Sequence, residues 1–192
     1  MTKPFKVESE DINRLNDIQL TQLLKELLHA EAYKFGIAQR AVEVALNIRV
    51  GDGGEDGRIS WVEGPDQTEF CPNRLTMFQN KATEMGPAAY ANEIMTAARG
   101  GSPSVLKPKV EEVLDNGGAY VDFTTQELNT TQKDERIAAI RDRLSEQGKA
   151  YADTCNIAIY DAAQISAWAN NFISTIASVQ HWVGRPMERG LK

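Results

Sequence analysis

The pattern of apolar and polar positions predicts a helix followed by three strands in the first half of the chain. Leucines recur three and four residues apart within residues 10–34, which is the spacing of one helix face. Within residues 42–50, every second side chain is a branched apolar one (Val42, Val44, Leu46, Ile48 and Val50), which predicts a strand with one buried face. Two further strands are expected at residues 58–63 and 75–82, with a loop between them.

Helical and strand patterns alternate in the second half. Helices are expected at residues 87–98, 108–114, 132–153 and 166–183, and strands at residues 120–124 and 156–160. Thr130 or Thr131 is expected to cap the long charged helix, because a hydroxyl can accept a hydrogen bond from its first turn. Elements in this order pack best as a mixed sheet with helices on its faces, so the predicted fold class is α/β.

Length and composition describe one domain, residues 1–192. With 192 residues, 42% of them hydrophobic, the chain can bury a single core. It contains no apolar run that could span a bilayer and no apolar N-terminal secretion segment, so we expect no membrane partner. Cys71 and Cys155 lie far apart and form no CxxC pair, which favours a reducing cytoplasm. Residues 184–192 follow a helix without a stop signal, so the domain is expected to begin a longer protein.

The net charge and the histidine content indicate which partners and ligands to expect. A net charge of −6 and a pI of about 5.1 argue against a passive nucleic-acid coat, which is normally basic. With only His29 and His181, a cluster of histidine ligands is nearly excluded. Acidic residues that bind a divalent cation add negative charge, and the bound metal restores attraction for phosphate. Because an acidic chain binds DNA weakly alone, we expect a homo-oligomer, a dimer or tetramer, formed through a longer chain.

Four residues form the candidate chemistry. Asp56 lies in the glycine-rich turn between two predicted strands, and Gln79 and Lys81 project to the same face of the third strand. Glu31 continues the leucine stripe of the first helix, where a buried acid needs a partner or a metal. Carboxylate and amide oxygens suit Mg²⁺, which lowers the pKa of a bound water. A lysine beside the metal can position that water or neutralise a phosphate.

The run GDGGEDGRISW, followed by MFQNKAT, resembles PD-(D/E)xK nucleases of the Mrr-like branch. In that branch a glycine-rich turn ends in Asp, and a following strand carries Gln-x-Lys. The resemblance implies a restriction-endonuclease-like mixed central sheet flanked by helices. It implies that Asp56 binds metal, that Gln79 replaces the usual acid and that Lys81 is the catalytic lysine. Glu31 corresponds to the acid that the first helix supplies in many members.

The implied activity is hydrolysis of double-stranded DNA by a Mg²⁺- or Mn²⁺-dependent endonuclease, with RNA open as an alternative substrate. Asp56, Gln79 and Glu31 would hold the metal. The chain also resembles the N-terminal effector nuclease domain of antiviral STAND NTPases, which implies a role in anti-phage defence. A non-catalytic module of the same fold, used for nucleic-acid binding or assembly, is the first alternative.

The second alternative is a calcium-binding domain. Asp52, Asp56 and Glu63 match positions one, five and twelve of an EF-hand loop, and Gly57 and Ile59 match positions six and eight. Position three is a glycine, and the expected flanks are a strand and a Gly-Pro pair instead of helices. The calcium alternative is therefore weaker than the nuclease interpretation.

Overall fold

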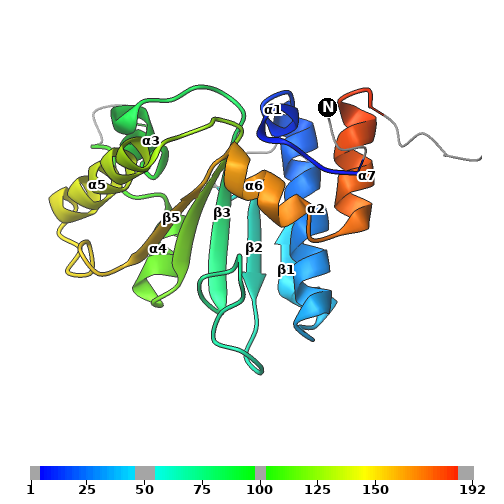
Figure 1. The fold of residues 1–192 in the computed structure, drawn as a ribbon. Coiled ribbons are helices and arrows are strands. Elements are labelled where there is room, and N and C mark those ends of the chain that lie inside the picture. The colour runs from blue at the N-terminus through cyan, green and yellow to red at the C-terminus, as the bar shows by residue number, and fades with distance from the viewer. Residues whose placement is uncertain (1–4, 46–54, 98–102, 186–192) are drawn as a thin grey trace, which may run out of the picture.

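The centre of the molecule is a five-stranded mixed sheet with helices on both faces (Figure 1). The computed structural model describes residues 5–45, 55–97 and 103–185. In sheet order the strands are β1 (Val42–Val44), β2 (Gly57–Ser60), β3 (Leu75–Lys81), β4 (Ala119–Thr124) and β5 (Asn156–Tyr160). The pairs β1–β2 and β2–β3 are antiparallel, and β3–β4 and β4–β5 are parallel. The predicted α/β class with a mixed sheet is confirmed.

Two groups of helices cover the sheet, one on each face (Figure 1). The first group is α1 (Ser9–Ile12), α2 (Asp17–Lys34), α6 (Ala162–Ala169) and α7 (Ile173–Trp182). The second group is α3 (Pro87–Glu93), α4 (Pro108–Asp115) and α5 (Thr130–Glu146), and a short 3-10 helix, Gln39–Ala41, precedes β1. Helices α3 and α4 connect β3 to β4, and α5 connects β4 to β5, as parallel neighbours require.

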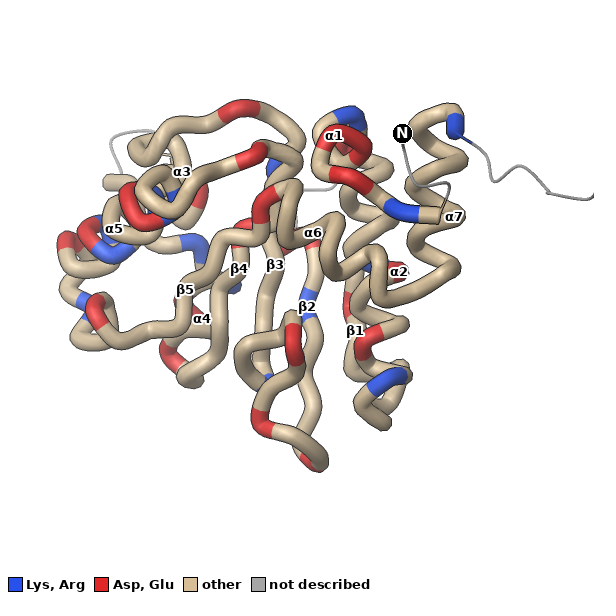
Figure 2. The backbone as a smooth tube through the Cα atoms, viewed as in Figure 1, with Lys and Arg blue, Asp and Glu red and all other residues tan. Residues whose placement is uncertain are grey.

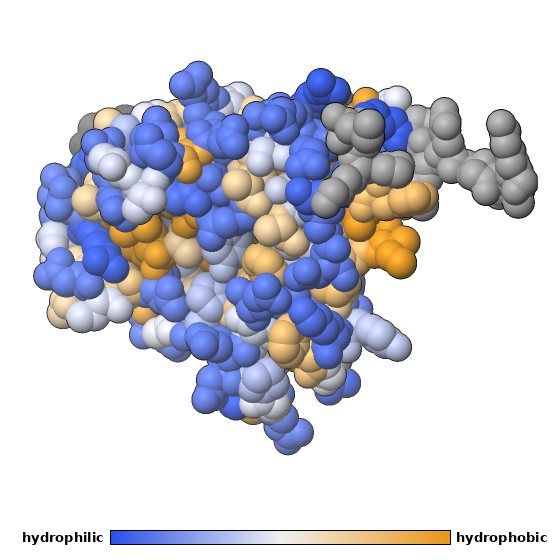
Figure 3. All heavy atoms as spheres, viewed as in Figure 1, coloured by the Kyte–Doolittle hydropathy of each residue, from blue (hydrophilic) through white to orange (hydrophobic). Residues whose placement is uncertain are grey.

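Each face of the sheet has its own core. Phe78 and Val121 pack with the leucines of α2 and with Trp168 of α6. On the other face, Met77 and Tyr120 pack against α4 and α5. Because successive strand residues point to opposite faces, β3 and β4 contribute to both cores. Most of the molecular surface visible in Figure 3 is hydrophilic, which agrees with the packing of apolar side chains in these two cores.

The predicted first helix is interrupted, and its predicted successor strand is short. Helix α1 ends at Ile12 and α2 begins at Asp17. Asn16 caps α2, because its side chain accepts a hydrogen bond from Gln19 N at 2.9 Å. Strand β1 covers Val42–Val44 of the predicted range 42–50, and residues 46–50 lie outside the described residues.

Helices in the second half also differ from prediction in where they begin and end. The cap of α5 is Asn129 rather than a threonine, since its side chain accepts from Gln132 N at 2.9 Å. The helix ends at Glu146, and Gly148 follows with a positive φ of 72°, a conformation that favours glycine. The predicted helix 166–183 is two helices, because α6 starts earlier, at Ala162, and ends before α7 begins.

The structure also describes the apolar character of the helices and the state of the two cysteines. Within the described ranges, no helix has the length and apolar character needed to cross a membrane. Cys71 and Cys155 are both free thiols.

Candidate active site

Asp56, Gln79 and Lys81 line one pocket at the C-terminal end of β3. The antiparallel ladder of β2 and β3 places Asp56, the residue before β2, beside this end of the strand. The Asp56 N–H donates to the carbonyl of Phe78 at 3.0 Å, and Asp56 Oδ2 accepts from the Asn80 N–H at 2.7 Å. The pocket has a volume of about 320 Å³. The structure therefore brings three of the four predicted site residues together.

The first turn of α2 forms another wall of this pocket. Asp17 and Thr21 line it, and Asn80 Nδ2 donates to Thr21 Oγ1 at 2.9 Å. Thr21 Oγ1 in turn donates to the Asp17 carbonyl at 2.9 Å. The helix is thus fixed against β3 on the side opposite Gln79 and Lys81, since neighbouring strand residues point to opposite faces.

Glu93, the last residue of α3, is a site residue that the sequence analysis missed. Its Oε2 accepts from Lys81 Nζ at 2.7 Å and from Gln79 Nε2 at 2.9 Å, with Lys107 Nζ at 3.7 Å. Partial burial acts to raise the pKa of Glu93. The hydrogen bond and charge of Lys81, with help from Lys107, outweigh that effect and hold this pKa below its ordinary value. Glu93 is therefore an ionised anchor for Lys81.

A second missed group lies beneath Gln79, on the neighbouring strand β4. The Tyr120 hydroxyl donates to Gln79 Oε1 at 2.6 Å and lies 3.5 Å from Asp122 Oδ1. Asp122 is fully buried, and its Oδ2 has no hydrogen-bond partner among the described residues. Burial raises the pKa of Asp122 to about 8, against the opposing charge of Lys81. An aspartate within the apolar run AYVDFT was the available sequence signal.

The structure does not bring Glu31 to this group. Its two oxygens accept from Phe70 N at 3.4 Å and from Trp168 Nε1 at 3.2 Å. Glu31 is ten residues beyond Thr21 in α2, which is about 15 Å along the helix axis. The buried acid on the leucine stripe is therefore satisfied by protein donors. We drop its assignment as a metal ligand and give it a structural role.

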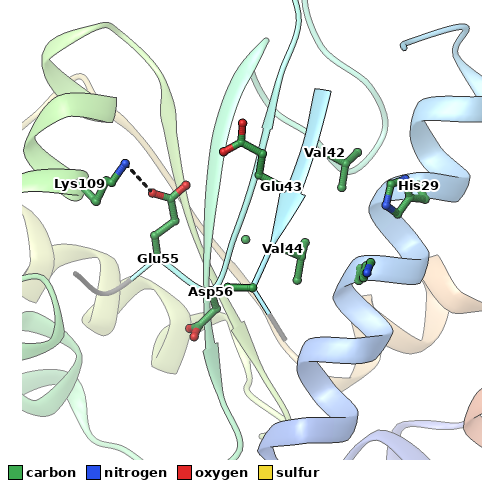
Figure 4. Close-up of a pocket in the computed structure, with 10 residues that line it drawn as sticks. His29, Val42, Glu43, Val44, Glu55, Asp56 and Lys109 are labelled. Atoms are coloured by element: carbon green, nitrogen blue, oxygen red, sulfur yellow. Dashed lines mark ion pairs between the residues drawn. The ribbon is translucent and has the colours of Figure 1, made fainter. Parts of the chain in front are cut away.

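A second pocket, of about 570 Å³, opens beside β1 (Figure 4). Glu55 and Lys109 line it and are 3.9 Å apart, and Glu55 also pairs with Arg58 at 2.5 Å. Asp56 belongs to its lining too, but Figure 4 shows the Asp56 carboxylate pointing away from that of Glu55. Because the Asp56 carboxylate bonds to Asn80, we assign it to the pocket at β3.

The donor atoms at β3 fit only a cation that keeps most of its water. In the described parts of the chain, no group of three or more His, Cys, Asp or Glu side chains could hold a metal ion. Mg²⁺, however, commonly binds through one or two carboxylates, with water and phosphate completing its shell. Asp56 is a carboxylate of this pocket. Gln79 is engaged by Tyr120 and Glu93, so it links the site's side chains and is not turned outward as a ligand.

The geometry around β2 disfavours the calcium loop. Gly57 and Ile59, two of its matched positions, belong to β2 and pair with strands on both sides. An EF-hand loop is flanked by helices. Asp52 lies outside the described residues, as does most of the glycine-rich turn.

Comparisons of the chain with family models, curated proteins and solved structures found no match. The functional argument therefore rests on the residues of the pocket and on the two short motifs. Of these, the pocket is the stronger support, because Asp56 and Lys81 both line it.

Proposed function

We propose that the chain is a metal-dependent endonuclease that cuts double-stranded DNA, with a restriction-endonuclease-like sheet. One observation carries the proposal: Asp56 and Lys81, 25 residues apart in sequence, line the same pocket. The main chain of β3 orients the carboxylate, and Glu93 holds the ammonium group. Phosphodiester hydrolysis needs this combination of a metal-binding acid and a fixed cation.

Each side chain has a distinct task in this proposal. Asp56 holds Mg²⁺ or Mn²⁺. The bound metal would supply Lewis acidity and lower the pKa of an attacking water. Lys81 offsets the negative charge that develops on the phosphoryl oxygens, which stabilises the transition state more than bound DNA. Glu93 and Gln79 keep the Lys81 ammonium in one place, so little reorganisation is required during the reaction.

The charge distribution supports activity within an assembly. Lys and Arg positions are interspersed with Asp and Glu, most clearly along α5 (Figure 2). Phosphate contacts supply most non-specific DNA affinity, and a chain with net charge −6 offers few of them. A homo-oligomer, as in an effector domain of a STAND-type defence protein, would combine several weak DNA-binding surfaces.

The direct test is divalent-dependent degradation of plasmid DNA. We expect cleavage with Mg²⁺ or Mn²⁺, none with a chelator, and loss of cleavage in Asp56→Asn and Lys81→Ala. Lys34→Ala is the matched control, because Lys34 pairs with Glu69 at the other end of α2. DNA binding without cleavage under every metal and assembly condition would reject the enzyme and favour the non-catalytic module.

A further inference from the structure

A run of five hydrogen-bonded side chains lies under the candidate site, on the face covered by α3, α4 and α5. It leads from Asp122 through Tyr120 and Gln79 to Glu93 and Lys81. Asp122 and Tyr120 are fully buried, and Gln79 is 2% exposed. Solvent therefore cannot replace a partner that is lost from the inner half of this run.

The chemistry of the partners fixes the direction of each hydrogen bond. The ionised carboxylate of Glu93 can only accept, so Gln79 must turn Nε2 toward it. Gln79 Oε1 then faces Tyr120, whose single hydroxyl proton is donated to it at 2.6 Å. The reversed carboxamide would set its oxygen against the carboxylate of Glu93. The observed orientation is thus the one that satisfies both neighbours.

Glu93 needs this support because of its place in the helix. It is the last residue of α3, where a carboxylate faces the negative end of the helix dipole. Helix ends also fray readily. Its Oε2 accepts hydrogen bonds from both Gln79 and Lys81. The position of the carboxylate is therefore set by residues of β3 and not by its own helix.

We infer that Tyr120 is a positioning residue of the candidate site: its buried hydroxyl fixes the Gln79 carboxamide, which holds Glu93 and, through it, Lys81. The effect on cleavage rests on the proposed function, whereas the effect on the carboxamide does not. The ring of Tyr120 packs in the core with Met77, a task that phenylalanine could perform. What the hydroxyl adds to phenylalanine is its hydrogen bond to Gln79.

Asp122 completes the inner end of the run. Because the Tyr120 proton is directed to Gln79, Asp122 can bond to the hydroxyl oxygen only as a protonated donor. The separation of 3.5 Å makes this bond long. The burial that raises the pKa of Asp122 to about 8 favours the protonated form that this direction requires.

The test compares Tyr120→Phe with Tyr90→Phe. Tyr90 is also fully buried, but its hydroxyl lies 3.4 Å from Gln126 Oε1. The first readout is hydrogen exchange of the Gln79 side-chain NH₂ in ¹H–¹⁵N spectra, assigned by its absence in Gln79→Glu. We expect exchange to rise at least about tenfold in Tyr120→Phe and to be unchanged in Tyr90→Phe, since only the first substitution frees the carboxamide.

The second readout is the rate of DNA cleavage at saturating DNA, with DNA affinity measured separately. We expect Tyr120→Phe to lower the rate about tenfold without weakening binding, because only the Lys81 anchor is loosened. Thermal melting checks that both variants fold. If Tyr120→Phe does not fold, a nuclear Overhauser effect between the Tyr120 hydroxyl and Gln79 amide protons of the unmodified protein is the expected result. A Tyr120 hydroxyl contact elsewhere would then overturn the inference.

Unchanged Gln79 exchange in Tyr120→Phe would overturn the inference outright. A freed carboxamide with an unchanged cleavage rate would overturn the positioning role. If the unmodified protein does not cut DNA at all, the proposed function fails, and the exchange measurement still decides whether Tyr120 fixes Gln79.

Discussion

Asp122→Asn should change how the stability of the protein depends on pH. Burial raises the pKa of Asp122 to about 8 from its ordinary value of 3.8, and Glu93 adds to this effect while Lys81 opposes it. The native protein thus keeps this proton up to about pH 8, whereas the unfolded chain loses it near pH 4. Between these values the unfolded state binds fewer protons, so the free energy of unfolding falls as pH rises.

The size of the effect follows from the same pKa values. Each pH unit in this window costs about 1.4 kcal/mol, so the contribution of Asp122 lowers stability by about 4 kcal/mol between pH 4 and pH 7. That is a large part of the ~5–15 kcal/mol stability of an ordinary domain. Asparagine keeps the shape of the side chain and is never ionised. The stability of Asp122→Asn relative to the unmodified protein should therefore improve steadily over this range.

Urea unfolding at several pH values from about 4 to about 8 measures this difference. Tryptophan fluorescence is a suitable signal, because Trp168 is fully buried. Asp153→Asn, at an exposed position, controls for the substitution itself. A stability difference between Asp122→Asn and the unmodified protein that stays constant across the range would refute the reasoning. It would show that Asp122 is not carried in the core as a protonated acid.

Three further substitutions test the division between site and scaffold. Lys81→Ala should retain DNA binding in gel shifts but lose about 10²–10³ in cleavage rate, because a fixed cation acts on the transition state; an unchanged rate would remove its catalytic role. Glu93→Gln should lower the rate about tenfold, equivalent to about 1.4 kcal/mol, whereas Glu84→Gln at an exposed position should not; equal rates would show that Lys81 needs no anchor. Glu31→Ala should destabilise the protein by about 2–4 kcal/mol in urea, because buried N–H groups lose their acceptor; slower cleavage by its folded form would return Glu31 to the site.

The sequence predicted those helices and strands that have a clear periodicity of apolar side chains. The apolar run at β5 fixed that strand to the residue, and the strand pattern at β3 placed Gln79 and Lys81 on one face. Asp56, the residue before β2, lies beside them, as the antiparallel ladder requires. These features follow from side-chain periodicity and from turn composition, which a single sequence displays.

The remaining features depend on contacts between distant segments. Glu31 lies on the predicted stripe, but its partner Trp168 is 137 residues away, so sequence spacing could not reveal the bond. Glu93 reaches β3 only because α3 ends beside Lys81. Asp122 is an acid in an apolar strand, but its place beside Gln79 follows only from the parallel register of β3 and β4.

A crystal soaked in Mn²⁺ and measured at the manganese absorption edge tests the central claim most directly. The account predicts an anomalous peak bonded to the Asp56 carboxylate, in the pocket that contains Lys81. Water should complete most of the coordination shell, since Asp56 is the carboxylate assigned to the metal. Manganese bound instead beside Glu55 in the pocket at β1, or no peak at Asp56 under conditions that support DNA cleavage, would contradict the account.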